Sequence, residues 1–430
     1  MELRPGYTMT ELGVLPEDWE VRPLFSIARI VGGGTPSTAI SAYWDGNISW
    51  FTPSEINDEK KYVSTSNKKI SDDGLKKSSA KLLPVGTILL TTRASIGLKS
   101  ILLLPATTNQ GFKNLIINDD IDNEFIYYLL TIFKKELLKQ ASGSTFLEIS
   151  PRKLGEILLC LPKSLPEQHA IAAALSDVDA LLDAQERLIA KKRNIKLAAM
   201  QQLLTGKTRL PGFQEPWIKK FFGEIFEFLP TNPYSRSQFV QRGCIRNIHY
   251  GDILTKFSFI IDISKDKLPF INKILSEKNY PQKCFLQNGD VVIANTAEDS
   301  TVGKAVEVIN IDGKVLSGQH TFLCRPKIRF AKGILGYLIN SEKFHGQLAA
   351  YVTGIKVSSI SKTSLSGLFL EFPPSFDEQR AIAAVLSDMD AELAALEARR
   401  DKLRAVKQGM MRELLTGRTR LAGAGGQHGQ

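Results

Sequence analysis

The chain has 430 residues, of which 43% are hydrophobic, and its 55 Lys and Arg against 45 Asp and Glu give a net charge of +10. This length is too great for one ordinary core and indicates two domains with connecting elements. Apolar runs such as 101–106 are much shorter than a membrane span, so we expect no membrane segment and a cytoplasmic location.

The basic charge favours an anionic partner but is not concentrated anywhere. Residues 1–166 carry 19 Lys and Arg against 18 Asp and Glu, and residues 211–377 carry 20 against 15. A nucleic-acid function would therefore need a partner's charge or dense contacts to base edges. We expect neither disulfides nor a metal site, because the five histidines lack metal-ligand spacing with the cysteines and no CxxC pair occurs among Cys160, Cys244, Cys284 and Cys324.

The first predicted domain covers residues 1–163 and begins with a lead-in segment that contains Gly13 and Trp19. Residues 81–97 are apolar and β-rich, and residues 125–140 have helical spacing. The natural prediction is a mixed α/β domain of the α+β class.

A long helix is predicted over 164–210. Ser164 and Glu167 have the spacing of a capping box, and Gly206 stands where a left-handed C′ residue belongs. Apolar residues follow a 4-3 spacing, but the polar residues Gln185, Lys192 and Lys196 interrupt this seam.

The second predicted domain covers 211–374 and repeats the plan of the first. Gly212 and Trp217 repeat the lead-in segment, residues 285–296 resemble the earlier strand region, and residues 334–351 have helical spacing. We expect a second α+β domain.

A second long helix is predicted over 375–421, because residues 378–421 align without a gap to 167–210 with 25 of 44 positions identical. The caps recur at Ser375, Glu378 and Gly417, and the seam is again interrupted, at Arg400 and Lys407. We predict a pseudo-twofold internal repeat in which the two helices pack as an antiparallel coiled-coil-like pair and set a distance between two domains. Two unrelated amphipathic helices, each on its own domain, are the alternative. The glycine-rich tail 422–430 is predicted to be flexible.

Two short motifs resemble enzyme signatures but lack essential parts. Residues 206–208 resemble the end of a phosphate-binding loop, but Gln201 replaces the first glycine and no strand precedes it. Residues 231–234 resemble an adenine methyltransferase motif without its second proline, and the three glycines at 32–34 precede Thr35-Pro36 and indicate a turn. We predict no active site and no cofactor site in this chain.

The order of several motifs resembles the specificity subunits of type I restriction-modification systems. GGTPS (33–37), GTILLTTRASIG (86–97) and TNQGFKNLI (108–116) look like parts of a target-recognition domain. The second half looks like another such domain, and the two long helices resemble the central and distal conserved regions of that family. The resemblance covers the whole chain apart from its tail.

This resemblance implies a DNA-binding subunit without catalytic activity. Each domain would read one half of a bipartite, asymmetric target in double-stranded DNA, and the helices would set the spacer and dock two modification (adenine methyltransferase) subunits. Two restriction subunits would join where the cell contains them. S-adenosylmethionine, and ATP and Mg for restriction, are then expected on the partner subunits.

Candidate DNA contacts are polar and aromatic residues of the motif loops, because Arg, Asn and Gln can bond base edges and Lys can hold phosphate. Packing in the core or an ordinary surface position is the alternative for each of them. The candidates in the first domain are Thr35, Ser37, Tyr43, Trp44, Asn47, Arg93, Asn109, Gln110, Lys113, Ser144 and Thr145. Those in the second domain are Tyr234, Arg236, Arg246, Asn247, His249, Tyr250, Asn295, Lys304, Gln319, His320 and Lys356.

Two other functions stay open from the residues alone. A stand-alone DNA methyltransferase or fused nuclease would need a cryptic cofactor site, and S-adenosylmethionine binding by the isolated chain would favour it. A coiled-coil adaptor that binds only proteins would show no sequence-dependent DNA affinity.

Overall fold

The computed structural model describes residues 5–58, 60–142, 147–276, 280–298, 301–348, 350–352 and 358–421. It divides into two compact units, the first made of Met1–Glu186 and Arg399–Gln430 and the second of Arg187–Ala398. Each unit thus contains one of the two predicted α+β domains and part of each long helix. The elements follow one another along the chain as domain, helix, domain and helix, but both long helices contribute to each unit.

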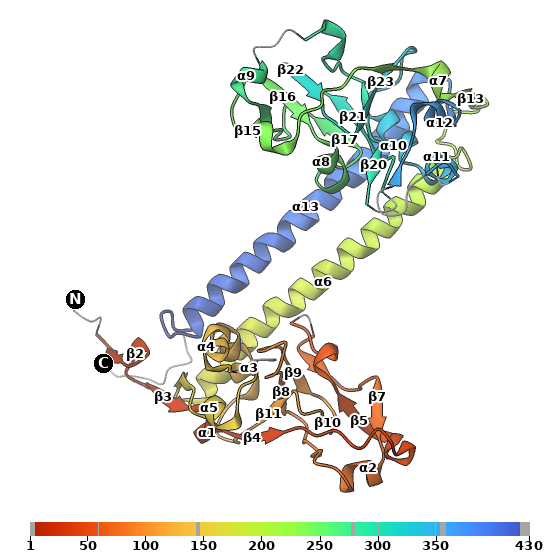
Figure 1. Ribbon diagram of the computed structural model, residues 1–430. Coiled ribbons are helices and arrows are strands. Elements are labelled where there is room, and N and C mark those ends of the chain that lie inside the picture. The colour runs from red at the N-terminus through yellow and green to blue at the C-terminus, as the bar shows by residue number, and fades with distance from the viewer. Residues whose placement is uncertain are drawn as a thin grey trace. The chain divides into compact units, whose positions relative to one another are not determined.

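The first unit is built on a five-stranded sheet, drawn in orange in Figure 1. Its strands, in spatial order, are β4 (Ala28–Gly32), β11 (Lys113–Ile117), β8 (Ile88–Leu90), β9 (Lys99–Leu102) and β6 (Tyr62–Val63). All neighbours pair antiparallel except β6 and β9, which are parallel. Strand β8 is buried along its whole length, as its uninterrupted apolar sequence requires.

The second unit repeats this sheet strand for strand (Figure 1). The order is β14 (Phe226–Leu229), β23 (Thr321–Pro326), β19 (Val291–Ala294), β21 (Ala305–Ile309) and β17 (Ile260–Asp262), with a parallel pair again at the last position. The two domains therefore share one topology although their sequences differ, and the predicted fold class is confirmed.

Each unit adds smaller sheets to this core. In the first unit they are β10 (Thr107–Thr108), β5 (Trp44–Phe51) and β7 (Lys68–Ile70), the pair β12 (Leu158–Pro162) and β3 (Trp19–Pro23), and the hairpin β1 (Tyr7–Thr10) and β2 (Gly13–Pro16). In the second unit they are β15 (Phe239–Val240), β18 (Phe270–Ile271), β16 (Ile245–Ile248) and β22 (Lys314–Ser317), the pair β13 (Ile218–Phe221) and β25 (Phe369–Phe372), and the pair β20 (Thr296–Ala297) and β24 (Ser358–Ser359).

Short helices complete the two domains. The helix predicted over 125–140 is two helices, because the chain turns at Phe133 (φ −86°, ψ 5°), and the region predicted at 334–351 is divided in the same way after Ile339. The helices of the first unit are α1 (Leu24–Ile27), η1 (Ser41–Tyr43), η2 (Pro53–Glu55), α2 (Asp72–Lys76), α3 (Asn123–Ile132), α4 (Lys134–Gln140) and α5 (Pro151–Gly155). Those of the second are α7 (Phe222–Ile225), η3 (Arg236–Gln238), α8 (Tyr250–Thr255), α9 (Lys273–Ser276), η4 (Gln282–Cys284), α10 (Ile334–Ile339), α11 (Glu342–Leu348) and α12 (Lys362–Ser366).

The two long helices are α6 (Leu165–Leu203) and α13 (Phe376–Leu414), both of 39 residues. At about 1.5 Å per residue each is roughly 58 Å long. The start of α6 and the end of α13 fill the core of the first unit through Leu175 and Leu414, and the opposite ends of the two helices fill that of the second unit through Leu203 and Leu386. Because both helices pack into both cores, each compact unit includes part of each helix.

Polar residues that interrupt the predicted seam form ion pairs between the helix segments within each unit. In the first unit Lys407 pairs with Asp179, and in the second Lys196 pairs with Asp390. The two pairs are equivalent, because Asp390 lies 211 residues after Asp179 and Lys407 lies 211 residues after Lys196. Arg400 and Lys192 also pair across, with Glu186 and Glu392. Partner numbers fall on one helix as they rise on the other, so the segments run antiparallel in each unit, as predicted.

The helix ends are matched as well. Gly206 and Gly417 have φ of +69° and +67°, the left-handed conformation that a C′ glycine adopts. The Ser375 hydroxyl accepts the Glu378 N–H at 3.4 Å, whereas the Glu378 carboxylate accepts from Nε and Nη2 of Arg209, both at 2.6 Å.

The equivalent carboxylate of the first unit, Glu167, receives Arg420 at 2.6 and 2.8 Å. Both carboxylates are buried, and each arginine follows the opposite helix end within its own unit. The S-x-x-E spacing therefore marks the start of each helix but also supplies a long-range ion pair that local sequence did not indicate.

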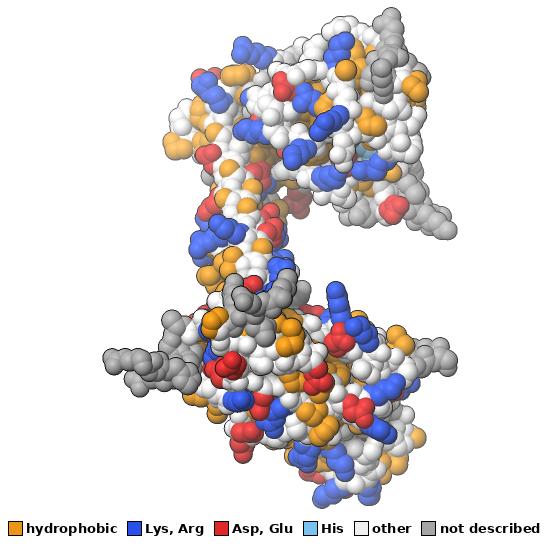
Figure 2. Space-filling model, turned by 90° about the vertical axis from the view of Figure 1, so that its left-hand side faces the viewer, with side chains coloured by type: hydrophobic (Ala, Val, Ile, Leu, Met, Phe, Trp, Pro, Cys, Tyr) orange, Lys and Arg blue, Asp and Glu red, His pale blue; other side chains and the backbone are white. Residues whose placement is uncertain are grey.

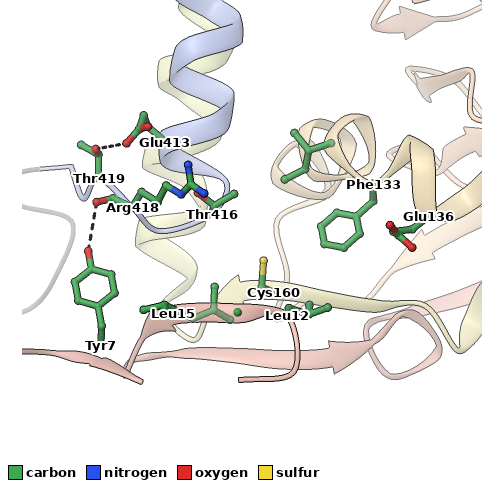
Figure 3. Close-up of a pocket in the computed structure, with 13 residues that line it drawn as sticks. Tyr7, Leu12, Leu15, Phe133, Glu136, Cys160, Glu413, Thr416, Arg418 and Thr419 are labelled. Atoms are coloured by element: carbon green, nitrogen blue, oxygen red, sulfur yellow. Dashed lines mark hydrogen bonds between the residues drawn. The ribbon is translucent and has the colours of Figure 1, made fainter. Parts of the chain in front are cut away.

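The lead-in hairpin β1–β2 lies against the end of α13 in the first unit. The Tyr7 hydroxyl is 3.0 Å from the carbonyl oxygen of Gly417. It is also 3.4 Å from the carbonyl oxygen of Arg418, as the dashed line in Figure 3 marks. The hairpin, Cys160 and Glu413 line a cavity of about 850 Å³. These contacts join the two ends of the described chain inside one unit.

Candidate nucleic-acid interface

Candidate residues that are far apart in the sequence collect at one end of the main sheet in each unit. In the first unit Lys113 pairs with Gly32, so the loop after β4 meets the loop before β11, and β8 ends beside them. In the second unit Leu229 pairs with Leu323 and Ala294 with Thr321, which gives the same meeting point. We call this end, where β4, β8, β14 and β19 finish and β11 and β23 begin, the variable end.

Thr35 and Gln110 form the centre of the variable end of the first unit. The Thr35 hydroxyl donates to Gln110 Oε1 at 2.5 Å, and both side chains are exposed. Glycine is required for this approach, since a Cβ at Gly33 would lie 2.0 Å from the carbonyl oxygen of Asn109. The glycine run therefore serves as a close turn that presents Thr35 and Gln110 to solvent.

Aromatic candidates of the first unit hold the neighbouring loop. The Trp44 indole N–H donates to the Ser37 carbonyl at 3.1 Å, and its ring packs edge-on against Trp50 at 5.0 Å between centroids. Tyr43 ends η1, and Asn47 lies exposed on β5. Trp44 thus positions Ser37, and its ring remains partly accessible.

The two basic candidates of the first unit share one carboxylate. Lys113 Nζ is 3.0 Å from Glu148, and Arg93 Nε is 3.9 Å from the same side chain. The Lys113 side chain is only 9% exposed, so the more accessible Arg93 is the better placed of the two to reach a ligand. Ser144 and Thr145 lie outside the described residues.

The variable end of the second unit carries a cluster of candidates around α8. His249 caps this helix, because its Nδ1 accepts the Gly251 N–H at 3.1 Å. The Tyr250 ring lies between His249, at 4.6 Å, and His320, at 5.2 Å. The carbonyl of His320 in turn accepts the Asn295 N–H at 3.0 Å.

Arg236 completes this cluster. Its guanidinium donates to Asp252 at 3.0 Å and lies 3.3 Å from His249 Nδ1, while its side chain is 55% exposed. Burial, and then the charge of Arg236, lower the pKa of His249. A neutral imidazole that accepts at Nδ1 carries its proton on Nε2. His249 itself is only 5% exposed.

Four candidates of the second unit are engaged inside the fold. Asn247 is fully buried and bonds Asn232, and the hydroxyl of the buried Tyr234 lies 2.8 Å from that of Tyr280. Arg246 donates to the Ile263 carbonyl and pairs with Asp312, and Lys304 donates to the carbonyls of Leu254 and Phe257. Gln319 is partly buried beside His320, and Lys356 lies outside the described residues.

Exposed lysines near these loops were missed by motif reasoning. Lys68 lies 5.9 Å from the Trp44 ring, and Lys69, Lys76 and Lys77 are exposed on the adjoining β7 and α2 region. In the second unit the exposed Lys256 pairs with Asp252 beside Arg236. The lysines of the first unit could have been noticed in the sequence as the two Lys-Lys pairs at 68–69 and 76–77.

The two units differ in charge. On the face seen in Figure 2, Lys and Arg side chains predominate on the second unit, whereas both signs are mixed on the first. This difference matches the compositions of residues 1–166 and 211–377.

The described residues include no group of three or more His, Cys, Asp and Glu side chains placed to hold a metal ion. In the same part of the chain, none of the helices has the length and apolar composition needed to cross a bilayer.

Comparisons with known proteins agree with this two-part architecture. The family model for the type I restriction modification DNA specificity domain matches twice, over residues 16–192 and 214–405. The MjaIX specificity subunit of Methanocaldococcus jannaschii is 42% identical over 181 residues, 41% of this chain and 42% of that protein. The MjaVIII specificity subunit of the same organism is 24% identical over 95% of this chain and 94% of its own length.

The fold also matches a crystal structure of the type I restriction-modification S subunit from M. genitalium. The TM-score is 0.55 at 16% identity, over 96% of this chain and 98% of the other. The chain belongs to the family of type I restriction-modification specificity subunits and contains two copies of its DNA specificity domain.

Proposed function

We propose that this subunit reads a bipartite, asymmetric sequence in double-stranded DNA, with one half-site contacted by the variable end of each unit. The helices dock two adenine methyltransferase subunits and set the length of the unread spacer. Where restriction subunits are present, two of them join the complex.

One observation carries this proposal: the two units have the same sheet order, but different side chains at the variable end. The first presents Thr35, Gln110 and Arg93, and the second presents Arg236 and His320 next to the buried His249. Two sheets of the same topology that carry different polar groups are suited to two different base sequences, because DNA sequence is read by hydrogen-bond donors and acceptors at base edges.

The chemistry of the exposed groups supports this division of roles. An Arg236 guanidinium can make two parallel hydrogen bonds to guanine, and the Gln110 amide can pair with adenine. Exposed lysines such as Lys68 and Lys256 would hold phosphates and give a salt-dependent affinity. The modest net charge suggests that partner subunits contribute further phosphate contacts.

We assign no catalytic step to this chain. S-adenosylmethionine, and ATP and Mg for restriction, belong on the partner subunits in this proposal. A purified chain that bound S-adenosylmethionine without a partner would contradict the assignment.

Exchange of a domain tests the proposal directly. Residues 211–374 are replaced by the corresponding domain of another specificity subunit, and methylated motifs are sequenced in DNA from cells that also express the methyltransferase partner. We expect one half-site to change and the other to persist. A change in both half-sites, or in neither, would show that the domains do not read independently.

A second experiment tests the spacer. Seven residues are inserted after Glu186 in α6 and seven before Arg400, which faces it within the first unit. Two added turns lengthen each helix by about 10 Å, or roughly three base pairs of about 3.4 Å. The spacer of the methylated motif should grow accordingly, and an unchanged spacer would eliminate a measuring role for the helices.

A further inference from the structure

The end of the main sheet opposite the variable end has the same backbone path in both units. After β11 the Asn118 N–H donates to Ile27 O at 3.0 Å, and after β23 the Lys327 N–H donates to Ile225 O at 2.7 Å. Four residues after Asn118, the Asp122 N–H donates to Gln168 Oε1 of α6 at 2.9 Å. Four residues after Lys327, the Ala331 N–H donates to Gln379 Oε1 of α13 at the same distance. We call this end the frame end, and its two loops can be compared position by position.

The loops of the frame end carry opposite charges. The loop of the first unit contains Asp119, Asp120 and Asp122, whereas that of the second contains Lys327, Arg329 and, two residues before α10, Lys332. The hydrogen bonds above place Arg329 at the position of Asp120. Both loops border a cavity, of about 280 Å³ in the first unit and about 560 Å³ in the second.

The cleft of the second unit combines cations with apolar walls. The Arg329 guanidinium lies 4.7 Å from the centroid of the Phe376 ring, and Phe330 packs edge-on against Phe372. Ile328 at the rim is 38% exposed. A planar guanidinium against an aromatic ring is suited to receive a carboxylate beside an apolar residue.

The three cations of this cleft form no ion pair with a described carboxylate, although the charge of Lys332 acts on the buried Glu307. Lys327 Nζ donates to the Gly223 carbonyl at 2.8 Å, and Lys332 Nζ donates to Asn310 Oδ1 at 2.5 Å. Glu307 lines the floor, but its oxygens accept the N–H groups of Gly333 and Gly336.

The acidic loop of the first unit, by contrast, has internal partners. Asp120 is 3.5 Å from Arg22, and Asp122 is 3.0 Å from His169 and also accepts the Phe125 N–H. The two frame ends thus differ in the sign of their charge and in its availability.

The position of the basic cleft favours a protein over DNA. Strand β23 begins next to His320 at the variable end and ends at the cleft, and its six residues span about 20 Å. A DNA duplex read at the variable end therefore approaches the unit from the other side.

We propose that the cleft formed by Lys327, Arg329, Lys332, Phe330 and Phe376 docks a carboxylate-bearing segment of the methyltransferase subunit. The first unit binds the second copy of that subunit without this contact, because its equivalent loop would repel the same segment. This inference rests on the proposed function. It means that two identical partners bind two inequivalent sites, the stronger one in the second unit.

The test uses the full-length chain with the methyltransferase subunit of its own system. Stepwise binding constants and stoichiometry are measured by native mass spectrometry and sedimentation at about 0.1 M and about 1 M salt, where the Debye length falls from about 10 Å to about 3 Å. R329E/K332E should weaken the stronger step by about tenfold or more at low salt and lessen its salt dependence. R329Q/K332Q should have a smaller effect in the same direction.

The matched control is D119K/D120K in the first unit, which should tighten the weaker step. Unchanged constants and salt dependence for R329E/K332E would overturn the inference alone. Loss of DNA affinity with partner binding intact would also overturn it, since the cleft would then hold DNA phosphate. A wild-type chain that binds no methyltransferase subunit would instead overturn the proposed function and this inference with it.

Discussion

Helices α3 and α10 occupy equivalent places in the two units, but the N–H groups at their starts are satisfied differently. The start of α3 is capped locally, because Asp122 accepts the Phe125 N–H at 2.6 Å. In α10 the N-cap is Gly333, which has no side chain, and Glu307 on β21 accepts the N–H groups of Gly333 and Gly336 instead. The position of Glu307 in the first unit is held by the buried Ile101.

This difference shows how one fold persists while its sequence diverges. The requirement that helix N-terminal donors find acceptors is constant, but the acceptor can come from the preceding residue or from a strand of the sheet. The local solution leaves the Asp122 side chain 12% exposed, whereas the long-range solution buries the Glu307 carboxylate completely within the sheet and α10. The two units should therefore respond differently to substitution and to pH.

The largest effect is expected for Glu307→Ala. It leaves two buried N–H groups without an acceptor and opens a cavity, so we expect a loss of about 3–5 kcal/mol in the stability of the second unit. Hydrogen exchange in the full chain should rise strongly in α10 and not in α3. Exchange in α10 at the wild-type rate would show that Glu307 is not the essential acceptor.

The buried carboxylate also predicts a pH dependence confined to the second unit. Burial raises the pKa of Glu307 to about 7 from its usual 4.5, so the folded state retains a proton that the unfolded state releases between these values. Stability from this group is greatest below pH 4.5 and is lost as the pH rises to about 7, by up to about 3 kcal/mol.

Urea unfolding of the wild type and of Glu307→Gln across this pH range isolates the contribution of Glu307. His249, whose lowered pKa gives the opposite slope below its usual value of 6.5, is common to both proteins. Parallel curves would contradict the assignment.

The two variable ends are compared by their effect on DNA sequence discrimination, not on protein stability. Arg236→Ala should cost about 1–3 kcal/mol of discrimination at the half-site read by the second unit, and Gln110→Ala should act only on the other half-site. Binding to duplexes with single changes in each half-site measures this. Arg236→Lys separates the planar fork from the charge, and Arg242→Ala serves as an exposed control. An equal effect of either variant on both half-sites would refute separate reading.

The smallest effect is expected for Asp122→Ala in the first unit. Loss of an N-cap costs about 1 kcal/mol, and the Gln168 contact to the Asp122 backbone N–H at 2.9 Å remains. Hydrogen exchange should rise modestly in α3 alone. A loss as large as that of Glu307→Ala would mean that the two caps are not alternatives for one task.

The long helices were predictable because their signals are local. Ser375, Gly206 and Gly417 mark helix ends through contacts within a few residues, and the gapless repeat showed that both helices share one plan. Lys196 and Lys407 were recognised only as interruptions of the seam. Their partners, Asp390 and Asp179, become neighbours only when the segments pack antiparallel within each unit.

The sequence by itself therefore determined the repeat, the helices with their ends and the α+β class, since caps, periodicity and glycine positions act over one or two turns. Tertiary structure alone decided which polar residues meet: Thr35 and Gln110 meet where both stay exposed, and the exposed Arg236 contacts the buried His249, while Asn247 and Lys304 are bonded inside. Residues such as Thr35 and Gln110 are 75 positions apart in the sequence, and which residues meet at such a distance follows from the packing of the whole domain.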